Sequence, residues 1–192
     1  EFRRVLFRSA VGLVNANALA LDDSGNLFVT AGGNSVVKIA PGSFPGPKTT
    51  VATVTNASTS LQGITLMSGG WLAVCDAGRQ GIVKINPATG AWINFTGFNG
   101  AGDTFGAPGS AQFNQPLGIS TAGGGMLVVT DNGNHRVKTV DANGNVCSLY
   151  GVCPADWVTG PGTLPGWWDG NGCPCQLSCM ICDNYAEARS PV

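Results

Sequence analysis

The sequence has few charged side chains. Only 10 Lys and Arg and 11 Asp and Glu occur among its 192 residues, or 11% of the chain, whereas an average soluble domain has about 25%. Disordered chains combine low hydrophobicity with high net charge, but 43% of these residues are hydrophobic and the net charge is −1. Coiled coils depend on Glu, Lys and Arg as well as Ala and Leu. The scarcity of charge therefore excludes both classes.

Long hydrophobic runs and a basic surface are absent as well. No apolar run in the sequence reaches the roughly 18 residues that a membrane span requires. The sequence pI is about 5.7, whereas a basic footprint for nucleic acid usually raises the pI of a domain above about 9. We therefore expect no membrane span in this segment and no nucleic-acid partner.

Glycine is abundant, with 29 residues, and it accompanies an internal repeat. Three segments align with one another: residues 15–42, 60–90 and 114–144. With Ala18, Gly63 and Gly118 taken as equivalent, the second apolar run of each copy ends thirteen residues later. The third apolar run of each copy contains a lysine, and the alignment treats these lysines as equivalent: Lys38, Lys84 and Lys138.

Each copy contains short apolar runs separated by turn residues. The first copy reads LALD, LFVTA and VVKIA, with turns rich in Gly and Asn between them, which supply positive φ at little steric cost. A fourth β-rich run follows each copy, at residues 49–55, 91–97 and 145–151. Four short antiparallel strands per repeat are typical of a β-propeller blade. We therefore predict an all-β fold with blades at about residues 15–58, 59–112 and 113–151.

The third copy resembles the NHL-repeat family of β-propellers. It reads Asn-Gln-Pro-Leu-Gly-Ile at 114–119, Leu-Val-Val-Thr-Asp at 127–131 and Asn-His-Arg-Val-Lys at 134–138, after the glycine-rich segment GFNGAGDTFGAPGSAQF. The other two copies are similar more loosely. The resemblance implies four-stranded antiparallel blades in a ring of about six. The three copies would then form about half of a propeller.

Both ends of the sequence are expected to be incomplete. Residues 1–9, EFRRVLFRS, are similar to the translated end of a common sequencing adapter, and we exclude them from the fold as one would exclude a fusion scar. Residues 186–192 align with 111–117, as if another blade were beginning. The predicted partial propeller therefore spans residues 10–192 of a longer polypeptide.

Cysteines cluster in an insert at about residues 152–185. Pro116 and Pro191 lie 75 residues apart, against 55 for Leu61 and Pro116, so the third connection is longer. The Cys-x-Cys-x3-Cys-x2-Cys spacing is compatible with zinc. Zinc sites usually pair two separated knuckles, so we favour three disulfides, with the connectivity open. The candidates are Cys147, Cys153, Cys173, Cys175, Cys179 and Cys182.

Two glycosylation sequons favour the secretory route. They begin at Asn56 (Asn-Ala-Ser) and Asn94 (Asn-Phe-Thr), and such acceptors lie on the surface of secreted proteins. The insert also contains three tryptophans: Trp157, Trp167 and Trp168. These tryptophans are either an exposed contact for protein or carbohydrate or the small core of a disulfide-braced loop, and both interpretations stay open.

Three neighbouring residues invite a catalytic interpretation. Asp131, His135 and Arg136 place a carboxylate, an imidazole and a guanidinium within six residues. The family resemblance implies a structural turn here, in which the Asp and the Arg hold neighbouring strands. Lyase and hydrolase relatives often have several histidines around the channel, and this sequence has one His. We therefore predict no catalytic residue and no metal site.

Three aspartates suggest calcium as a cofactor. Asp22, Asp23 and Asp103 offer the oxygen ligands that a hard cation prefers. Each also lies beside a Gly or Asn turn, where Asp is favoured for its backbone hydrogen bonds. Turn chemistry is therefore the favoured interpretation, and no cofactor is predicted. Cys75, in a strand where the other copies have Thr, is predicted to be a buried free thiol.

These features together favour a non-catalytic scaffold. We predict a secreted or cell-surface glycoprotein whose propeller mediates protein contacts or self-assembly, as in an extracellular filament or coat. Its partners would be proteins and N-linked glycans. One alternative is a propeller lyase or hydrolase with a metal in the channel. A second is an RNA-binding NHL domain, which would need a basic face.

Overall fold

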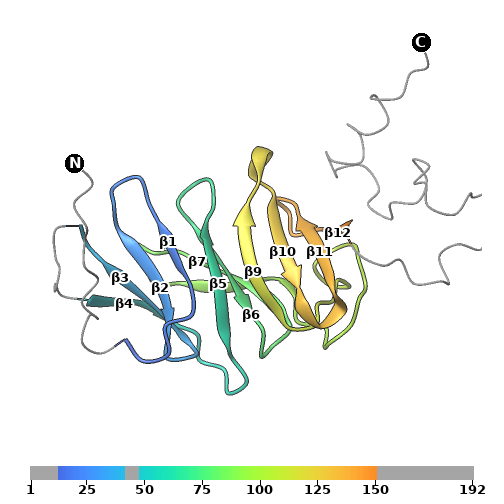
Figure 1. Cartoon of the computed structure of the whole chain (residues 1–192), viewed down its shortest axis with the longest axis horizontal. Coiled ribbons are helices and arrows are strands. Elements are labelled where there is room, and N and C mark those ends of the chain that lie inside the picture. Colours follow the sequence, from blue (N-terminus) through green and yellow to red (C-terminus); the bar gives the residue numbers. More distant parts are fainter. Residues whose placement is uncertain (1–12, 42–47, 151–192) are drawn as a thin grey trace, which may run out of the picture.

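A computed structural model describes residues 13–41 and 48–150 of the chain. These residues form three four-stranded antiparallel sheets, which Figure 1 shows side by side in chain order. The predicted all-β fold of four-stranded propeller blades is confirmed. Several predicted features lie outside the described residues: residues 1–9, the insert at 152–185 with Cys153, Cys173, Cys175, Cys179, Cys182, Trp157, Trp167 and Trp168, and residues 186–192.

Each sheet is a meander in which strands pair in chain order. The first sheet contains β1 (Leu19–Leu21), β2 (Leu27–Ala31), β3 (Ser35–Ile39) and β4 (Lys48–Thr53). The second contains β5 (Leu61–Leu66), β6 (Leu72–Asp76), β7 (Gly81–Ile85) and β8 (Trp92–Gly97). The third contains β9 (Pro116–Thr121), β10 (Leu127–Asp131), β11 (Arg136–Val140) and β12 (Val146–Tyr150), with short 3-10 turns η1 (Gly123–Gly125) and η2 (Asn132–Asn134). No helix in the described ranges is long and apolar enough to cross a membrane.

Aspartates close tight turns between strands. In the turn from β1 to β2, Asp22 Oδ1 accepts hydrogen bonds from the backbone N–H of Ser24 at 3.0 Å and of Asn26 at 2.7 Å. Asp141 accepts the same pair of bonds in the turn from β11 to β12. The Asn26 side chain also donates to Asp22, and this hydrogen bond lowers the pKa of the Asp22 carboxyl. These aspartates stabilise the turn geometry through local side-chain to backbone bonds.

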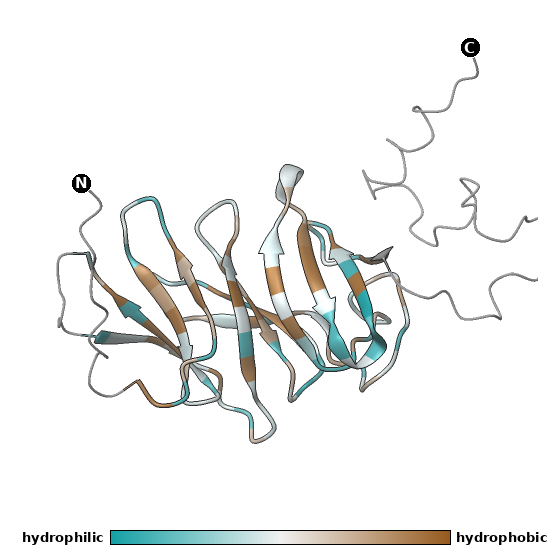
Figure 2. Cartoon of the chain, viewed as in Figure 1, coloured by the Kyte–Doolittle hydropathy of each residue, from teal (hydrophilic) through white to brown (hydrophobic). Residues whose placement is uncertain are grey.

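Two apolar cores hold the sheets together. In the first core, Phe28 and Val36 of the first sheet pack with Val74 and Ile85 of the second. The second core joins the second sheet to the third and contains the fully buried ring of Phe113. Figure 2 shows the corresponding hydrophobic positions along the strands. Since both faces of the second sheet are covered, all five residues of β6 are buried.

The sheets approach one another at their first strands. β1 contacts β5, and β5 contacts β9, whereas β4, β8 and β12 form the opposite edges of the three sheets. At Gly63 of β5 an added Cβ would lie 2.9 Å from the Ile119 nitrogen and 3.1 Å from the Gly118 Cα. Glycine is required there because the backbones of two neighbouring sheets leave no room for a side chain.

The strand register corrects one sequence equivalence. Lys38 pairs with Phe28 and Lys84 pairs with Ala73, but Lys138 pairs with Val129, one position further along β10. Because alternate residues of a strand point to opposite faces, Lys138 lies on the opposite face from Lys38 and Lys84. The assumed equivalence of the three lysines was therefore wrong for the third copy.

Candidate functional site

Four charged side chains gather beside the loop that joins β8 to β9. Lys138 Nζ lies 2.7 Å from Asp131 Oδ2 and 3.0 Å from Asp103 Oδ1, and Arg136 Nε lies 2.6 Å from Asp103 Oδ2. The side chains of Lys138 and Asp131 are both fully buried. We call these four residues the charged cluster. Two cations balance two anions, which offsets part of the cost of removing them from water.

The charged cluster ties this loop to the third sheet. Asp131 Oδ1 accepts a hydrogen bond from the backbone N–H of Asn114 at 2.7 Å, and Lys138 Nζ donates to the Gln112 carbonyl at 2.8 Å. The Asn134 side chain donates to Asp131 Oδ2 at 2.6 Å. Charged partners make these hydrogen bonds stronger than neutral ones. The cluster thus positions the end of the loop just before β9 begins.

Aromatic rings complete the surroundings of Lys138. The rings of Phe105 and Phe113 both have their centres 5.1 Å from Lys138 Nζ, within the range of cation–π attraction. Phe105 also lies 5.8 Å from the Arg136 guanidinium. Both cations of the charged cluster, Arg136 and Lys138 of β11, therefore have an aromatic ring of the preceding loop beside them.

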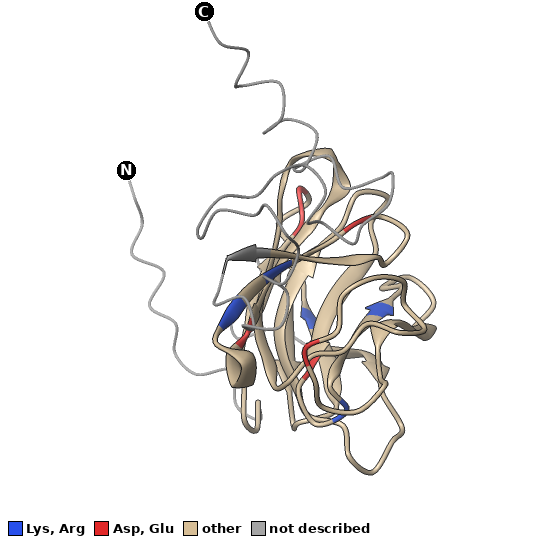
Figure 3. Cartoon of the chain, turned by 90° about the vertical axis from the view of Figure 1, so that its right-hand side faces the viewer, with Lys and Arg blue, Asp and Glu red and all other residues tan. Residues whose placement is uncertain are grey.

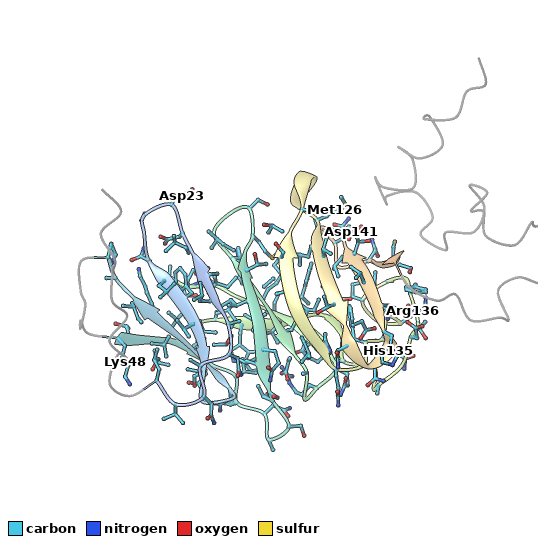
Figure 4. The ribbon with its side chains drawn as sticks, in the orientation of Figure 1. Asp23, Lys48, Met126, His135, Arg136 and Asp141 are labelled. Atoms are coloured by element: carbon cyan, nitrogen blue, oxygen red, sulfur yellow. The ribbon has the colours of Figure 1, made fainter. Side chains whose placement is uncertain are left out.

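The predicted turn residues Asp131, His135 and Arg136 do not converge. His135 is exposed, has a left-handed φ of +54°, and donates its backbone N–H to the Asn132 carbonyl at 3.1 Å. Figure 4 shows His135 at the turn end of the third sheet. Arg136 pairs with Asp103 and not with Asp131. The three groups therefore form no acid–base relay.

A related arrangement occurs at the corresponding turn of the second sheet. Asp76 is fully buried, accepts the backbone N–H of Ser60 at 2.9 Å, and pairs with Arg79 Nε at 2.7 Å. The Arg79 guanidinium also lies 4.7 Å from the Phe98 ring and 5.5 Å from the Trp92 ring. The first sheet has Ala31 at the position of Asp76 and Asp131. The second and third sheets thus share a buried carboxylate that accepts a backbone N–H and pairs with a cation.

The buried thiol of Cys75 is confirmed. Cys75 is a free cysteine with no exposed surface, and its Sγ lies 3.8 Å from the Gly118 carbonyl oxygen in the next sheet. Burial raises the pKa of this thiol, and the nearby carboxylates of Asp131 and Asp76 add to the effect. A thiol without access to solvent and without thiolate character is a poor nucleophile.

Cys75 is therefore expected to resist alkylation in the folded protein. Iodoacetamide should leave the Cys75 peptide unlabelled under native conditions and label it fully in denaturant, as measured by peptide mass spectrometry. A matched control is Thr130→Cys, which places a thiol at the equivalent but exposed position of the third sheet and should be labelled at once. Labelling of Cys75 in the native protein at the rate of the control would contradict the burial described here.

Both sequon asparagines are exposed. Asn56 lies in an exposed turn between the first and second sheets, and its Oδ1 accepts the backbone N–H of Ser58 at 3.2 Å. Asn94 lies on β8, and its Oδ1 accepts a bond from Arg79 Nη1 at 3.1 Å. The amide nitrogen that carries an N-linked glycan is not engaged by either bond. Thr96 of the second sequon, however, is only 1% exposed.

The structure describes one of the predicted disulfide cysteines, Cys147, and all three of the predicted calcium candidates. Cys147 of β12 is disulfide-bonded. Asp22 is engaged by its turn, Asp23 lies exposed beside it (Figure 4), and Asp103 pairs with Arg136 in the charged cluster. Among the described residues, no group of three or more His, Cys, Asp or Glu is arranged to hold a metal ion.

Two members of the charged cluster were not recognised as partners from the sequence. The sequence alone offers Asp103 as a calcium ligand or, preferably, a turn residue, and Lys138 as a marker of the repeat. Two features of the sequence hint at this cluster. Asp103 lies two residues before Phe105, and Arg136 and Lys138 are two residues apart, which places them on the same face of a strand. The contact between them joins segments some 35 residues apart, so no local pattern reveals it.

Comparisons with known proteins agree with the repeat architecture. The NHL repeat family matches residues 113–140, which is the third copy. No curated protein matches the sequence.

Several solved structures share the fold. Virginiamycin B lyase from Staphylococcus aureus is 17% identical, with 68% of this chain and 39% of that chain covered and a TM-score of 0.53. A gluconolactonase from Xanthomonas campestris is 16% identical, with 67% and 44% covered and a TM-score of 0.51. A chain of a nidogen/laminin complex is 20% identical, with 68% and 44% covered and a TM-score of 0.51. The chain thus spans about two fifths of the length of these structures, and the similarity shows the fold alone.

Proposed function

We propose that this NHL-repeat β-propeller chain is a non-catalytic scaffold of a secreted or cell-surface glycoprotein. Its propeller would mediate protein–protein contacts or assembly, as in an extracellular filament or coat. The whole protein's partners would be other proteins or further copies of itself, with N-linked glycans on its surface.

The structural use of the buried charges carries this proposal. Asp131 and Asp76 accept backbone N–H groups and pair with Lys138 and Arg79. These contacts position loops and turns, and a rigid framework is what a binding scaffold needs. Each of these carboxylates therefore has both a backbone N–H and a cation of the chain itself as partners. This supports a structural role for the described sheets.

The exposed sequons and one fold neighbour support the secreted setting. Asn56 and Asn94 are both exposed, which a glycosylation acceptor requires. A chain of a nidogen/laminin complex shares the fold, so a propeller of this kind is found in a protein complex. These observations favour protein partners for the scaffold.

A propeller lyase or hydrolase is the competing proposal. Virginiamycin B lyase and a gluconolactonase share the fold at 17% and 16% identity, so this framework supports catalysis in other proteins. An RNA-binding NHL domain is less favoured, because Figure 3 shows the described basic and acidic residues dispersed and not gathered into a basic face. Elemental analysis of the whole protein separates the first alternative from a scaffold, since a channel enzyme would hold a metal in stoichiometric amount.

Glycan occupancy tests the secreted setting. We expect both asparagines to carry N-linked glycans in the protein isolated from its source, and Asn56→Gln and Asn94→Gln each to remove one glycan mass. Ser58→Ala should abolish the modification of Asn56, whereas Ser58→Thr should retain it, because the acceptor needs a hydroxyl two residues later. Mass spectrometry before and after treatment with glycosidase and reductant measures the glycan mass and the number of free thiols. Unmodified Asn56 and Asn94 together with free thiols at the candidate cysteines would contradict the secreted assignment.

A further inference from the structure

The fold presents the Asn56 sequon at its surface. Asn56, Ala57 and Ser58 are all exposed in the turn between the first and second sheets. The turn is held by local hydrogen bonds, since the backbone N–H of Thr59 donates to the Asn56 carbonyl at 3.1 Å and that of Ser58 donates to Asn56 Oδ1 at 3.2 Å. Exposed segments with few buried contacts open at little cost in free energy. An enzyme can therefore bind this sequon in the folded chain.

The Asn94 sequon lies within β8, where the pairing with β7 is irregular. Asn94 pairs with Val83, but Thr96 pairs with the neighbouring residue Ile82, so that Phe95 is an extra residue in the strand. Paired residues of antiparallel strands share a face, and successive residues of one strand point to opposite faces. The bulge therefore places the side chains of Asn94 and Thr96 on opposite faces of the second sheet.

The side chain of Thr96 lies in the apolar interior. Its partner Ile82 belongs to the core that joins the second sheet to the third, and Thr96 itself is only 1% exposed. Among the residues that the structure describes, Thr96 Oγ1 has no hydrogen-bond partner. The first sheet has the same bulge with the apolar residue Ala52 at the equivalent position. The fold thus gains nothing from this buried hydroxyl, whereas the acceptor motif requires it.

The side chain of Asn94 can carry a glycan in the folded sheet. Its Oδ1 accepts a hydrogen bond from Arg79 Nη1 at 3.1 Å, and Arg79 is itself held by Asp76. An N-linked glycan is attached to Nδ2 and leaves Oδ1 in place to accept this bond. The folded chain is therefore compatible with a glycan on Asn94, but it does not present the Thr96 hydroxyl that the transfer requires.

We propose that Asn94 is glycosylated only before the second sheet forms, while the chain is still being made, whereas Asn56 remains an acceptor after folding. The proposal rests on the secreted setting proposed above. In the transfer, Nδ2 of the asparagine forms a bond to the anomeric carbon of an oligosaccharide carried on a lipid diphosphate. The bond from that carbon to the diphosphate breaks, the diphosphate leaves with its electron pair, and the amide nitrogen loses one proton. Folding then buries Thr96 and removes the acceptor site.

Glycosylation of the purified full chain in solution tests this difference. The chain is produced without glycans, folded, and incubated with an oligosaccharyltransferase and a lipid diphosphate oligosaccharide, and peptide mass spectrometry follows each asparagine. Asn94 should be modified at least about tenfold more slowly than Asn56, because the reaction at a buried site is limited by the population of the open form. Synthetic peptides of residues 53–60 and 91–98 should be modified at similar rates, since neither sequon is folded there.

A variant that unfolds the second sheet should remove the difference. Val74→Asp places a charge at a fully buried position of β6, which an apolar core does not tolerate, and Asn94 should then be modified at the rate of Asn56. Val14→Asp is the matched control, because Val14 is 65% exposed, and it should leave Asn94 protected. Iodoacetamide labelling of Cys75, which also lies on β6, reports whether the second sheet is folded in each sample.

Modification of Asn94 at the rate of Asn56 in a folded chain with a protected Cys75 would overturn the proposal. Failure of the 91–98 peptide or of the Val74→Asp variant to accept a glycan at Asn94 would overturn it as well. The secreted setting fails by a different result, namely protein from its source without a glycan at either asparagine. Protein with glycans at both asparagines whose folded chain accepts them equally would overturn the order of modification alone.

Discussion

Replacing Asp131 with alanine is expected to lower the free energy of unfolding by about 3–5 kcal/mol, because removing one partner of a buried ion pair leaves the other charge uncompensated. The cation that would lose its partner is Lys138, whose side chain has no exposed surface. The backbone N–H of Asn114 would also lose its acceptor. Among the described residues, Asp103 would be the one carboxylate left in an ion pair with Lys138, and it also pairs with Arg136 at 2.6 Å. Urea denaturation followed by fluorescence or circular dichroism measures the loss.

An exposed aspartate of the first sheet provides the control for this prediction. Asp23→Ala removes the same functional group from an exposed turn and should change the stability by no more than about 0.5 kcal/mol. Asp131→Asn should fall between the two, because the amide oxygen still accepts the Asn114 N–H while the charge is lost. A loss for Asp131→Ala as small as that for Asp23→Ala would show that the charged cluster does not hold the loop.

Replacing Gly63 with alanine is expected to destabilise the chain by about 3 kcal/mol, near the upper end for overpacking a close-packed site. An added Cβ would lie 2.9 Å from the Ile119 nitrogen and would also contact the Leu117 carbonyl. Both are backbone atoms of the next sheet, so no flexible side chain can move aside. The second and third sheets would have to separate. Hydrogen exchange should therefore increase in β5 and β9 more than in β1 to β3.

The matched control for Gly63 is Gly109. Its added Cβ would meet no atom within 4 Å, so Gly109→Ala should leave the stability unchanged or raise it by about 0.4–1 kcal/mol, through the lower entropy of the unfolded chain. Equal effects of the two substitutions in thermal or urea unfolding would contradict the close approach of the sheets at Gly63.

The strands and turns could be predicted because they depend on local chemistry repeated three times. Apolar runs such as LFVTA and LVVTD are separated by turn residues. Asp22 and Asp141 accept hydrogen bonds from backbone N–H groups two or four residues later in the same turn. The lengths of the turns are harder to predict from the sequence. The turn after β2 joins Ala31 to Ser35, but the turn after β10 joins Asp131 to Arg136, and this one-residue difference moved Lys138 to the other face. A periodicity of two makes strand faces sensitive to any such shift.

The contacts of the charged cluster could not be predicted, because they join distant segments. Asp103 and Arg136 meet only when the loop before β9 folds over the third sheet. The family resemblance implies that Asp131 and Arg136 hold neighbouring strands. In the structure Asp131 pairs with Lys138, and Arg136 pairs with Asp103. The choice among several cations and carboxylates depends on which side chains are buried together, which is a property of packing and not of spacing.

Native mass spectrometry of the protein purified from its source most directly tests the proposed scaffold function. We predict that the protein is recovered from the medium or the cell surface with a mass that exceeds that of its polypeptide by glycans that a glycosidase removes, and with no stoichiometric metal ion. Recovery from the cytosol as an unglycosylated polypeptide that carries one metal ion per chain would contradict the account and favour a propeller enzyme.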